Sequence, residues 1–234
     1  GKLGTDFNEN QTIIASTTPS IGWTSVTGQT TGNTITLTNG AVVMNTMTVK
    51  TATATVAVNS SISSQNVVVG TTGFTTVKLD LDASGSGEDV RLNSFEITAD
   101  TPTETGGDSV PTNCFAYSAA GTRLNSSAVN PTEAEMTFTL TTFLILKKGS
   151  IETISIKCDV PSGLIADNSF RWTLTGGTNV WTGVGSTSGQ SVTVGVKANG
   201  NGPTLTWKGA GTFTVVRDAS SPSYTVVRSG QNNV

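Results

Sequence analysis

The sequence predicts an all-β protein built from tandem β-sandwich modules with immunoglobulin-like or Greek-key connections. Short stretches of alternating apolar and Thr or Ser residues are separated by Gly, Asn and Ser turns about every ten residues, which is typical of β-sandwiches. No stretch of ten or more residues has the hydrophobic period of a helix. One part of the pattern also occurs twice. A single elongated β-barrel or jelly roll is the alternative fold.

The repeated part begins at a tryptophan in each copy. Trp23 opens the first copy and Trp181 opens the second, at an offset of 158 (181 − 23). The other matched stretches are residues 34–37 with 191–194, 46–50 with 204–208, 53–56 with 212–215, and 59–68 with 218–227. A repeat of this length is a domain-sized unit and not a solenoid rung.

The repeat divides the chain into three predicted parts. Residues 1–58 resemble the back half of a module, and residues 59–216 are expected to form a complete module. Residues 217–234 hold a strand that opens a next module or is donated to a neighbour. The boundary between the first two parts is placed at Asn59, where a short polar stretch breaks the strand period.

The N-terminal part contains several predicted strands. Residues 11–15 give a weak strand signal, whereas residues 34–38 and 46–50 alternate clearly and are predicted to be half-buried antiparallel strands. The dipeptide Asn39-Gly40 is typical of a hairpin turn. Residues 51–58 continue the period of two up to the predicted boundary.

The complete module contains most of the predicted strands. These are residues 66–69, 74–82, 90–97, 114–117, 136–140, 143–146, 151–160 and 170–174. Between Leu92 and Phe95 the apolar positions change parity, which is what a β-bulge would produce. Residues 143–146 are continuously apolar and are expected to be buried.

The chain has two cysteines, Cys114 and Cys158. Cys158 shares one face of its predicted strand with Ile154 and Ile156, so it points toward the core. One disulfide would close a loop of about 45 residues and stabilise the fold by about 3–4 kcal/mol. Two separate buried thiols are the alternative.

Composition excludes several classes of function. The net charge is −3, the isoelectric point is about 4.9 and no basic cluster is present, so we expect no nucleic-acid partner. No apolar run reaches about 18 residues, so we expect no membrane span. No signal-peptide leader is visible, so any leader has been removed or was never included. Histidine is absent, which removes the commonest general base and zinc ligand.

Residues 80–85 are the sharpest candidate for an ion site. Their carboxylates, hydroxyl and glycine fall at positions 1, 3, 5 and 6 of a calcium-loop pattern. The twelfth position is Arg91, where such a loop needs an acid, so an exposed strand face running into a turn is the competing interpretation. The hypothesis is one Ca²⁺, the only candidate cofactor, held by Asp80, Asp82, Ser84, Glu88 and Asp89.

Two pairs of carboxylates, Glu133 with Glu135 and Asp80 with Asp82, could suggest glycoside hydrolysis. Each pair has i, i+2 spacing on one strand face, so a solvated surface is the simpler interpretation. The sequence has no nucleophile elbow, no Gly-rich phosphate loop and no His-containing triad. We therefore do not expect an enzyme.

Aromatic side chains could form a platform for sugar rings. The candidates are Trp23, Trp172, Trp181, Trp207, Tyr117 and Tyr224. The equivalent positions of Trp23 and Trp181 in the repeat favour a packing role instead. Asn10, Asn59 and Asn125 match the pattern of N-glycan acceptors.

Three short motifs, at residues 87–92, 115–124 and 148–156, follow one another in a recognisable order. They resemble the β-sandwich repeats of very large surface proteins of candidate-phyla bacteria (CPR or Patescibacteria-like). Residues 218–222 resemble the linker that opens each next repeat in those proteins. The resemblance implies an extracellular structural role and supplies no catalytic residues.

The predicted strand that contains Tyr224, Val226 and Val227 repeats residues 66–69. A lone strand leaves backbone groups unpaired, so we expect it to pair with another sheet. The expected function is an extracellular structural protein, a subunit of a cell-surface filament or surface layer. Copies, or neighbouring modules, would join head to tail by strand complementation. The alternative is an adhesin or carbohydrate-binding module of a longer tandem surface protein, with a glycan partner.

Overall fold

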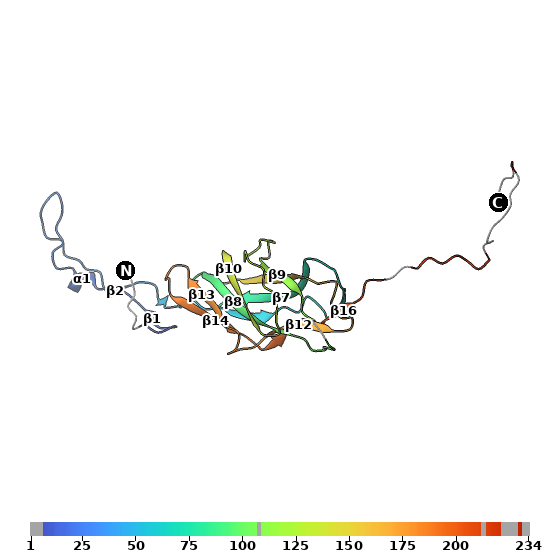
Figure 1. The fold of residues 1–234 in the computed structure, drawn as a ribbon. Coiled ribbons are helices and arrows are strands. Elements are labelled where there is room, and N and C mark those ends of the chain that lie inside the picture. The colour runs from blue at the N-terminus through green and yellow to red at the C-terminus, as the bar shows by residue number, and fades with distance from the viewer. Residues whose placement is uncertain (1–6, 107–108, 212–213, 221–228, 231–234) are drawn as a thin grey trace.

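The structure is a computed structural model that describes residues 7–106, 109–211, 214–220 and 229–230 of the 234-residue chain. A β-sheet body carries an N-terminal arm on one side, and residues 214–220 extend from the other side (Figure 1). The only helix described has four residues, so the predicted all-β class is confirmed.

The elements follow one another along the chain with these bounds. They are β1 (Thr12–Ile13), β2 (Ser16–Thr17), α1 (Pro19–Gly22), β3 (Val42–Val43), β4 (Met47–Thr48), β5 (Thr55–Val58), β6 (Gln65–Val68), β7 (Phe74–Asp82), β8 (Val90–Asp100), β9 (Thr112–Tyr117), β10 (Glu135–Leu146), β11 (Ile151–Asp159), β12 (Ser169–Leu174), β13 (Trp181–Gly185), β14 (Ser191–Val196), β15 (Gly200–Asn201) and β16 (Leu205–Lys208).

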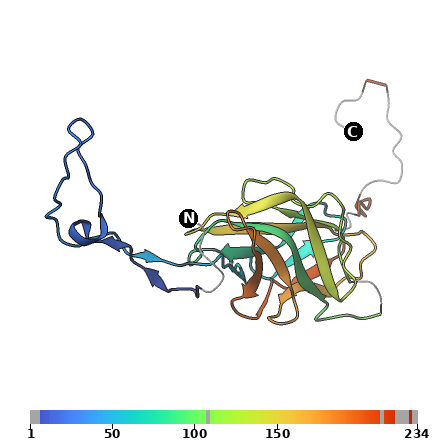
Figure 2. The ribbon, with the colours of Figure 1, turned by 90° about the vertical axis from the view of Figure 1, so that its left-hand side faces the viewer.

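Twelve strands form one sheet that folds over on itself and encloses the core (Figure 2). Its order is β6-β16-β12-β8-β13-β14-β5-β7-β11-β9, with β10 paired to β8 and β15 paired to β12. Most pairs are antiparallel, but β14 pairs with β5 and β16 pairs with β6 in parallel. We call this body, from Thr51 to Lys208, the sandwich.

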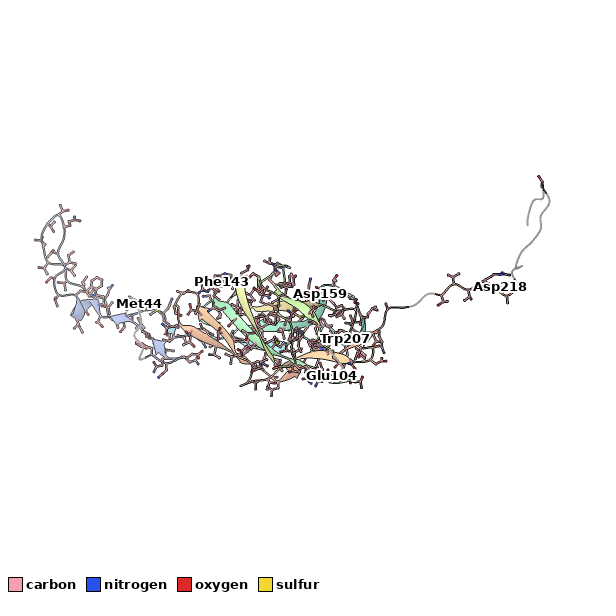
Figure 3. All side chains as sticks on the ribbon, in the orientation of Figure 1. Met44, Glu104, Phe143, Asp159, Trp207 and Asp218 are labelled. Carbon is pink, nitrogen blue, oxygen red and sulfur yellow. A yellow bond between two sulfur atoms is a disulfide. The ribbon has the colours of Figure 1, made fainter. Side chains whose placement is uncertain are left out.

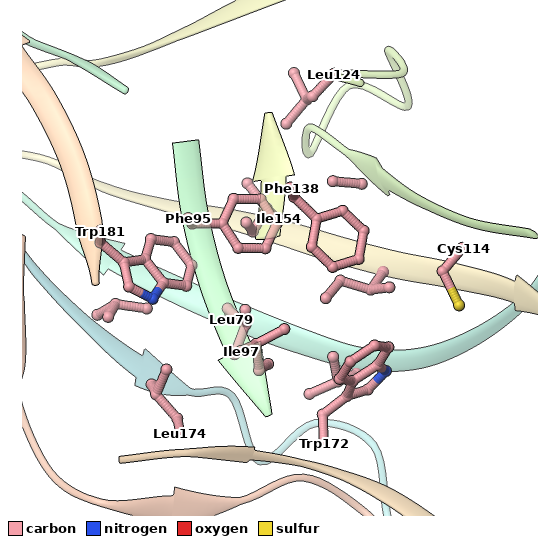
Figure 4. Packing of buried hydrophobic residues seen from close by; sticks show 14 of the residues in the cluster. Leu79, Phe95, Ile97, Cys114, Leu124, Phe138, Ile154, Trp172, Leu174 and Trp181 are labelled. Atoms are coloured by element: carbon pink, nitrogen blue, oxygen red, sulfur yellow. The ribbon is translucent and has the colours of Figure 1, made fainter. Parts of the chain in front are cut away.

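The centre of the sandwich is an aromatic stack (Figure 4). The ring of Phe95 in β8 lies 4.8 Å from that of Phe138 in β10 and 4.5 Å from that of Trp181 in β13, measured between centroids. Leu79 of β7 and Ile154 of β11 are buried in the same cluster. Phe95 lies directly opposite both Phe138 and Trp181, so the stack runs across three neighbouring strands and buries a large apolar area on that wall of the folded sheet.

The predicted bulge in β8 is confirmed. Ser94 lies opposite Thr182, whereas Leu92 lies opposite Gly183, so Asn93 is an extra residue on β8. The bulge keeps both Leu92 and Phe95 in the core despite their odd spacing.

The expected burial of residues 143–146 applies to only two of them. Leu144 and Leu146 point into the core, while Phe143 and Ile145 are exposed. β10 pairs with β8 alone and presents one face to solvent, so its side chains alternate between core and water.

The predicted domain boundary at Asn59 is also wrong, because β5 belongs to the sandwich. Val56 lies opposite Leu81 of β7 and opposite Val196 of β14, and it is fully buried. A cut after Val58 would remove a strand that joins the two walls of the sheet. The sandwich begins near Thr51, whose carbonyl accepts a hydrogen bond from the backbone of Gly87.

Residues 7–50 form the arm, which projects from the sandwich (Figure 2). It contains α1 and two small antiparallel pairs, β1 with β4 and β2 with β3. Many of its large apolar side chains are exposed, and these are Phe7, Ile14, Ile21, Trp23, Ile35, Val42, Val43, Met44 and Met47. Within residues 7–50 the sequence has only two charged side chains, Glu9 and Lys50.

Candidate assembly site

The arm repeats the backbone geometry of β12 to β16. In the arm, Thr12 lies opposite Thr48 in an antiparallel pair. In the sandwich, Ser169 lies opposite Thr206 in an antiparallel pair. Val49 donates its N–H to the carbonyl of Gln11 at 2.8 Å and accepts from the N–H of Asn10 at 2.8 Å. Trp207 makes the same two bonds with Asn168 and Asp167, both at 2.9 Å.

A lysine side chain forms a hydrogen bond across the end of each of these two strand pairs. Lys50 Nζ donates to Asn10 Oδ1 at 2.5 Å, and Lys208 Nζ donates to the carboxylate of Asp167. Asn10 and Asp167 both have a positive φ, 67° and 69°. Asn and Asp tolerate this left-handed conformation better than other non-Gly residues. The two halves therefore share a backbone conformation as well as a pairing pattern.

The correspondence extends through the rest of the arm. Ser16 lies opposite Val43 in the pair β2–β3, as Thr173 lies opposite Asn201 in the pair β12–β15. In each hairpin turn a glycine donates its N–H to a carbonyl four residues earlier. The bonds are Gly32 to Gly28 at 2.8 Å and Gly189 to Gly185 at 2.9 Å. The two donor glycines have φ values of 65° and 71°. The two copies therefore share local structure at these points, although the arm has only the single bridge between Thr27 and Thr34 where the sandwich has β13 and β14.

The two copies differ in burial. Trp23 is 57 % exposed, whereas Trp181 is fully buried against Phe95. In the sandwich, β12 and β13 pair with β8, and β16 pairs with β6. Among the residues that the structure describes, no strands occupy these positions beside the arm. The large apolar side chains of the arm are therefore exposed.

One edge of β4 is open in the same way. The backbone groups of Val49 face β1, so those of Thr48 face the opposite edge. In β16, alternate residues likewise face β12 and β6, because Thr204 and Lys208 accept hydrogen bonds from the backbone of residues 65 and 69. The edge of β4 that carries Thr48 thus corresponds to the edge of β16 that receives β6. An unpaired edge of this kind is a ready template for an added strand.

The C-terminal segment repeats the beginning of the sandwich. The N–H of Ser61 donates to Asn59 Oδ1 at 2.9 Å, and the N–H of Ser220 donates to Asp218 Oδ1 at 2.7 Å. A hydrogen bond from the Ser220 hydroxyl, followed by the bond from its backbone N–H, lowers the pKa of Asp218. Val215, the counterpart of buried Val56, is 78 % exposed. The segment therefore has the same turn as residues 59–61, and it exposes a valine whose counterpart is buried in the sandwich.

We define the candidate assembly site as the exposed apolar side chains of the arm together with the open edge of β4. Met44, on the arm, and Asp218, in the C-terminal segment, lie at opposite ends of the molecule (Figure 3). Sequence reasoning found the repeat but missed the Asn10–Lys50 contact. Only part of the signal was available, because the repeat aligns Lys50 with Lys208 but begins after Asn10 and Asp167.

The strand predicted to carry assembly contains Tyr224, Val226 and Val227. These residues lie outside the described part of the chain. The described residues just before them, 214–220, therefore carry the structural argument for the C-terminal segment.

The structure contains the disulfide between Cys114 of β9 and Cys158 of β11. Their Cα atoms are 4.1 Å apart, both side chains are buried, and 44 positions separate them in the sequence. Of the two alternatives left open by the sequence, the bonded pair is the one that the structure shows.

The five residues of the calcium hypothesis do not converge. Asp80 accepts hydrogen bonds from Asn59 Nδ2 at 2.9 and 2.8 Å, and another from Thr153 Oγ1 at 2.6 Å. Asp82 accepts from the N–H of Ser84 at 2.9 Å and lies 3.3 Å from Lys197 Nζ. The hydrogen bonds from Ser84, followed by Lys197, lower the pKa of Asp82 against the opposing effect of burial.

The other two carboxylates are engaged elsewhere. Glu88 Oε2 accepts from the N–H groups of Thr187 and Ser188 at 2.6 and 2.9 Å, which fixes the turn between β13 and β14. Asp89 pairs with Lys147 Nζ at 2.8 Å and accepts from the N–H of Lys148 at 3.0 Å. Within the described residues no three His, Cys, Asp or Glu side chains cluster as a metal site. The Ca²⁺ hypothesis is therefore corrected, because these oxygens already have separate partners.

Hydrogen bonding shifts the pKa values of these two groups. Burial alone would raise the pKa of Glu88, but the hydrogen bonds from Ser188 and Thr187 outweigh it and leave the pKa lowered. Hydrogen bonds from the side chain of Lys147 and the backbone of Lys148 lower the pKa of Asp89. Both groups stabilise the folded chain in their charged form.

The predicted glycan acceptors have different surroundings. Asn125 is only 2 % exposed, accepts from the N–H of Ala116 and donates to the carbonyl of Ser127, each at 2.7 Å. The amide nitrogen of Asn59 donates to both oxygens of Asp80. Asn125 is buried, so the structure contradicts it as an acceptor in the folded chain, whereas Asn59 is partly exposed and stays a prediction. Asn10 is exposed and stays a prediction.

The candidate aromatic platform is not assembled on the sandwich. Trp172, Trp181 and Trp207 are fully buried, and Trp207 Nε1 donates to the carbonyl of Ser109 at 2.7 Å. Trp23 lies on the arm, and Tyr117 packs under Lys157. Three of the four tryptophans therefore pack in the core.

The carboxylate pairs have structural partners. Glu133 accepts from Thr101 Oγ1 at 2.8 Å, and Glu135 accepts from Asn179 Nδ2 at 3.3 Å. Over the part of the chain that the structure describes, no helix is long and apolar enough to cross a membrane.

The comparisons with known proteins identify no relative similar enough to support an inference about this chain. No protein-family model and no curated protein matches the sequence. Among solved structures, the chain is similar to a family 123 glycoside hydrolase from Clostridium perfringens, described for glycolipid glycan hydrolysis. The identity is 11 %, the match covers 68 % of this chain and 28 % of that one, and the TM-score is 0.26. Similarity this low bears on neither fold nor function.

Proposed function

We propose that the chain is an extracellular structural protein, a subunit of a cell-surface filament or surface layer that assembles head to tail by strand complementation. The main supporting observation is that Val56 is buried, whereas Val215, at the equivalent position of the repeat, is exposed. A β-branched residue that alternates with polar neighbours favours a half-buried strand, so the exposed copy points to a partner.

The arm supports this proposal from the other end of the molecule. It already has the strand pairs β1–β4 and β2–β3, yet one edge of β4 is unpaired and large apolar side chains face water. Exposed apolar patches of this kind mark interaction surfaces in soluble proteins. The scarcity of charged residues along the arm also favours contact with protein over permanent solvation.

The disulfide supports the extracellular part of the proposal. Structural disulfides persist in oxidising compartments and are rare in the cytosol. The structure offers no matching observation for the alternative glycan-binding role, because three of the four tryptophans are buried.

The test compares the full chain with a variant that lacks residues 212–234. Light scattering over a range of concentrations and electron microscopy would measure assembly, and circular dichroism would confirm that both chains are folded. The full chain is expected to form linear polymers that grow with concentration, and the shortened chain is expected to stay monomeric. If the full chain is monomeric at every concentration, the proposal is rejected.

A further inference from the structure

In the sandwich, residues 55–68 form two parallel strand pairs with residues 195–208. β5 runs parallel to β14, with Val56 opposite Val196. β6 runs parallel to β16, with Asn66 opposite Thr206. The turn at Asn59 connects the two strands. Residues 55–68 are therefore one continuous clasp on the back half of the module.

The arm contains the sequence counterparts of both strands that the clasp pairs with, and of these β4 is formed as a strand whereas residues 35–40 are not. Residues 34–39 correspond to β14, because the bridge between Thr27 and Thr34 repeats the pairing of Val184 with Ser191. β4 corresponds to β16, and its open edge carries Thr48, the counterpart of Thr206. In the described part of the chain, no strand pairs with that edge.

Residues 214–227 are the sequence counterpart of the clasp. The described portion has the same turn, since Ser220 donates to Asp218 as Ser61 donates to Asn59. It also leaves Val215 exposed where Val56 is buried. The clasp sequence and the surface that a clasp would hold are thus both present, at opposite ends of one molecule (Figure 3).

Building on the head-to-tail assembly proposed above, we propose that residues 214–227 of one copy bind along the arm of a second copy. The register is that of residues 55–68 along residues 195–208. Val215 of one copy lies beside Asn39 of the other, and residues 224–227 run parallel to β4 with Thr225 beside Thr48. The contact joins two copies, because the arm and residues 214–220 of one molecule point in opposite directions.

The chemistry of the two surfaces fits strand addition. Added strands bind mainly through backbone hydrogen bonds, while alternate side chains enter apolar positions. Over residues 214–227 the only charged side chains are Arg217 and Asp218, at the turn. The equivalent turn in the sandwich, at Asn59, also carries a polar side chain that points away from the core toward Asp80. The apolar positions of the clasp are thereby left free to enter the arm.

Engineered disulfides test the register directly. The test variant carries Thr48→Cys and Thr225→Cys in the full chain. A calibrating variant carries Asn66→Cys and Thr206→Cys, which are adjacent in the sandwich and must form a bond within one chain. An out-of-register variant carries Thr48→Cys and Val227→Cys. The native cysteines are both bonded, so they do not compete, and mass spectrometry of peptides would confirm this.

Each variant is oxidised mildly and separated on a non-reducing gel. The test variant is expected to give a ladder of covalent multimers that disappears on reduction. The out-of-register variant is expected to lose most of that ladder, and the calibrating variant to remain monomeric with an internal bond. Bonding of the calibrating pair without a ladder from the test pair overturns the proposed register.

Microscopy of the same samples separates this inference from the proposed function. If polymers form but only the out-of-register pair bonds, the register is overturned while the head-to-tail assembly stands. If no polymers form and no ladder appears, both the register and the assembly are rejected.

Discussion

Val56 is fully buried opposite Leu81 and Val196, whereas Val215, its counterpart in the repeat, is 78 % exposed. The two residues share a sequence context but not an environment. The difference is the presence of partner strands around the first and their absence from the described surroundings of the second. Substitutions at Val215 and at Val56 can therefore test assembly and folding separately.

Replacing Val215 by Asp should abolish assembly and leave the melting temperature of the monomer unchanged, because the side chain is exposed in the monomer. The matched control is Ile145→Asp, which replaces another exposed apolar residue, on β10 opposite Arg91. Light scattering should show polymers for the control and monomers for the test variant. Equal assembly of the two variants would count against a role for Val215.

Replacing Val56 by Ala should instead destabilise the sandwich itself. Deleting two buried methyl groups removes their transfer free energy and leaves a cavity, at a cost of about 2 kcal/mol. Urea unfolding would measure this as a lower midpoint with an unchanged slope. An unchanged midpoint would mean that β5 is not part of the cooperative core.

Replacing both cysteines, Cys114 and Cys158, by Ala should lower the free energy of unfolding. The lost restriction of the unfolded chain corresponds to about 3–4 kcal/mol for a loop of this length. Chemical denaturation of the variant and of the native protein, the latter with and without reductant, would measure the loss. Equal stability in all three cases would show that the bond is absent or contributes nothing.

Replacing Trp207 by Phe should destabilise the chain by about 1–3 kcal/mol, because the carbonyl of Ser109 loses its buried donor. Trp23→Phe is the matched control, since Trp23 is exposed and donates to Thr17 Oγ1 at the surface. Thermal unfolding of monomeric samples should distinguish the two variants. A larger loss for Trp23 would contradict the assignment of Trp207 to the core.

The stability should fall in acid as Glu88 takes up a proton. A carboxyl group with a lowered pKa in the folded state binds protons less readily there than in the unfolded chain. Its contribution is therefore fully present above the ordinary value of 4.5 and is lost as the pH falls through the lower folded value. Glu88→Gln should flatten this part of the profile, measured by urea unfolding from pH 7 to pH 3. An unchanged profile would show that Glu88 does not drive the loss.

The sequence also predicted the calcium pattern at residues 80–85, and the structure shows why a pattern of this kind is insufficient. Asp80 and Asp82 are alternate residues of β7, and each faces a different neighbour, Thr153 for one and Lys197 for the other. A calcium loop must curl so that its oxygens converge, which an extended strand does not do. The spacing of the ligands was visible in the sequence, but the path of the backbone was not.

The sequence by itself determined the strand class, the parity switch at the bulge between Leu92 and Phe95, and the repeat. These features follow from short-range periodicity and local backbone preferences, which each segment carries wherever it lies. This is why the arm has strand pairs that correspond to β12–β16 and β12–β15 even without the strands that surround them in the sandwich. Only the tertiary structure decided that β5 belongs to the sandwich, that Asn125 is buried, and that Trp23 is exposed while Trp181 is not. Burial is a property of the strands that surround a residue, and those strands come from distant parts of the chain.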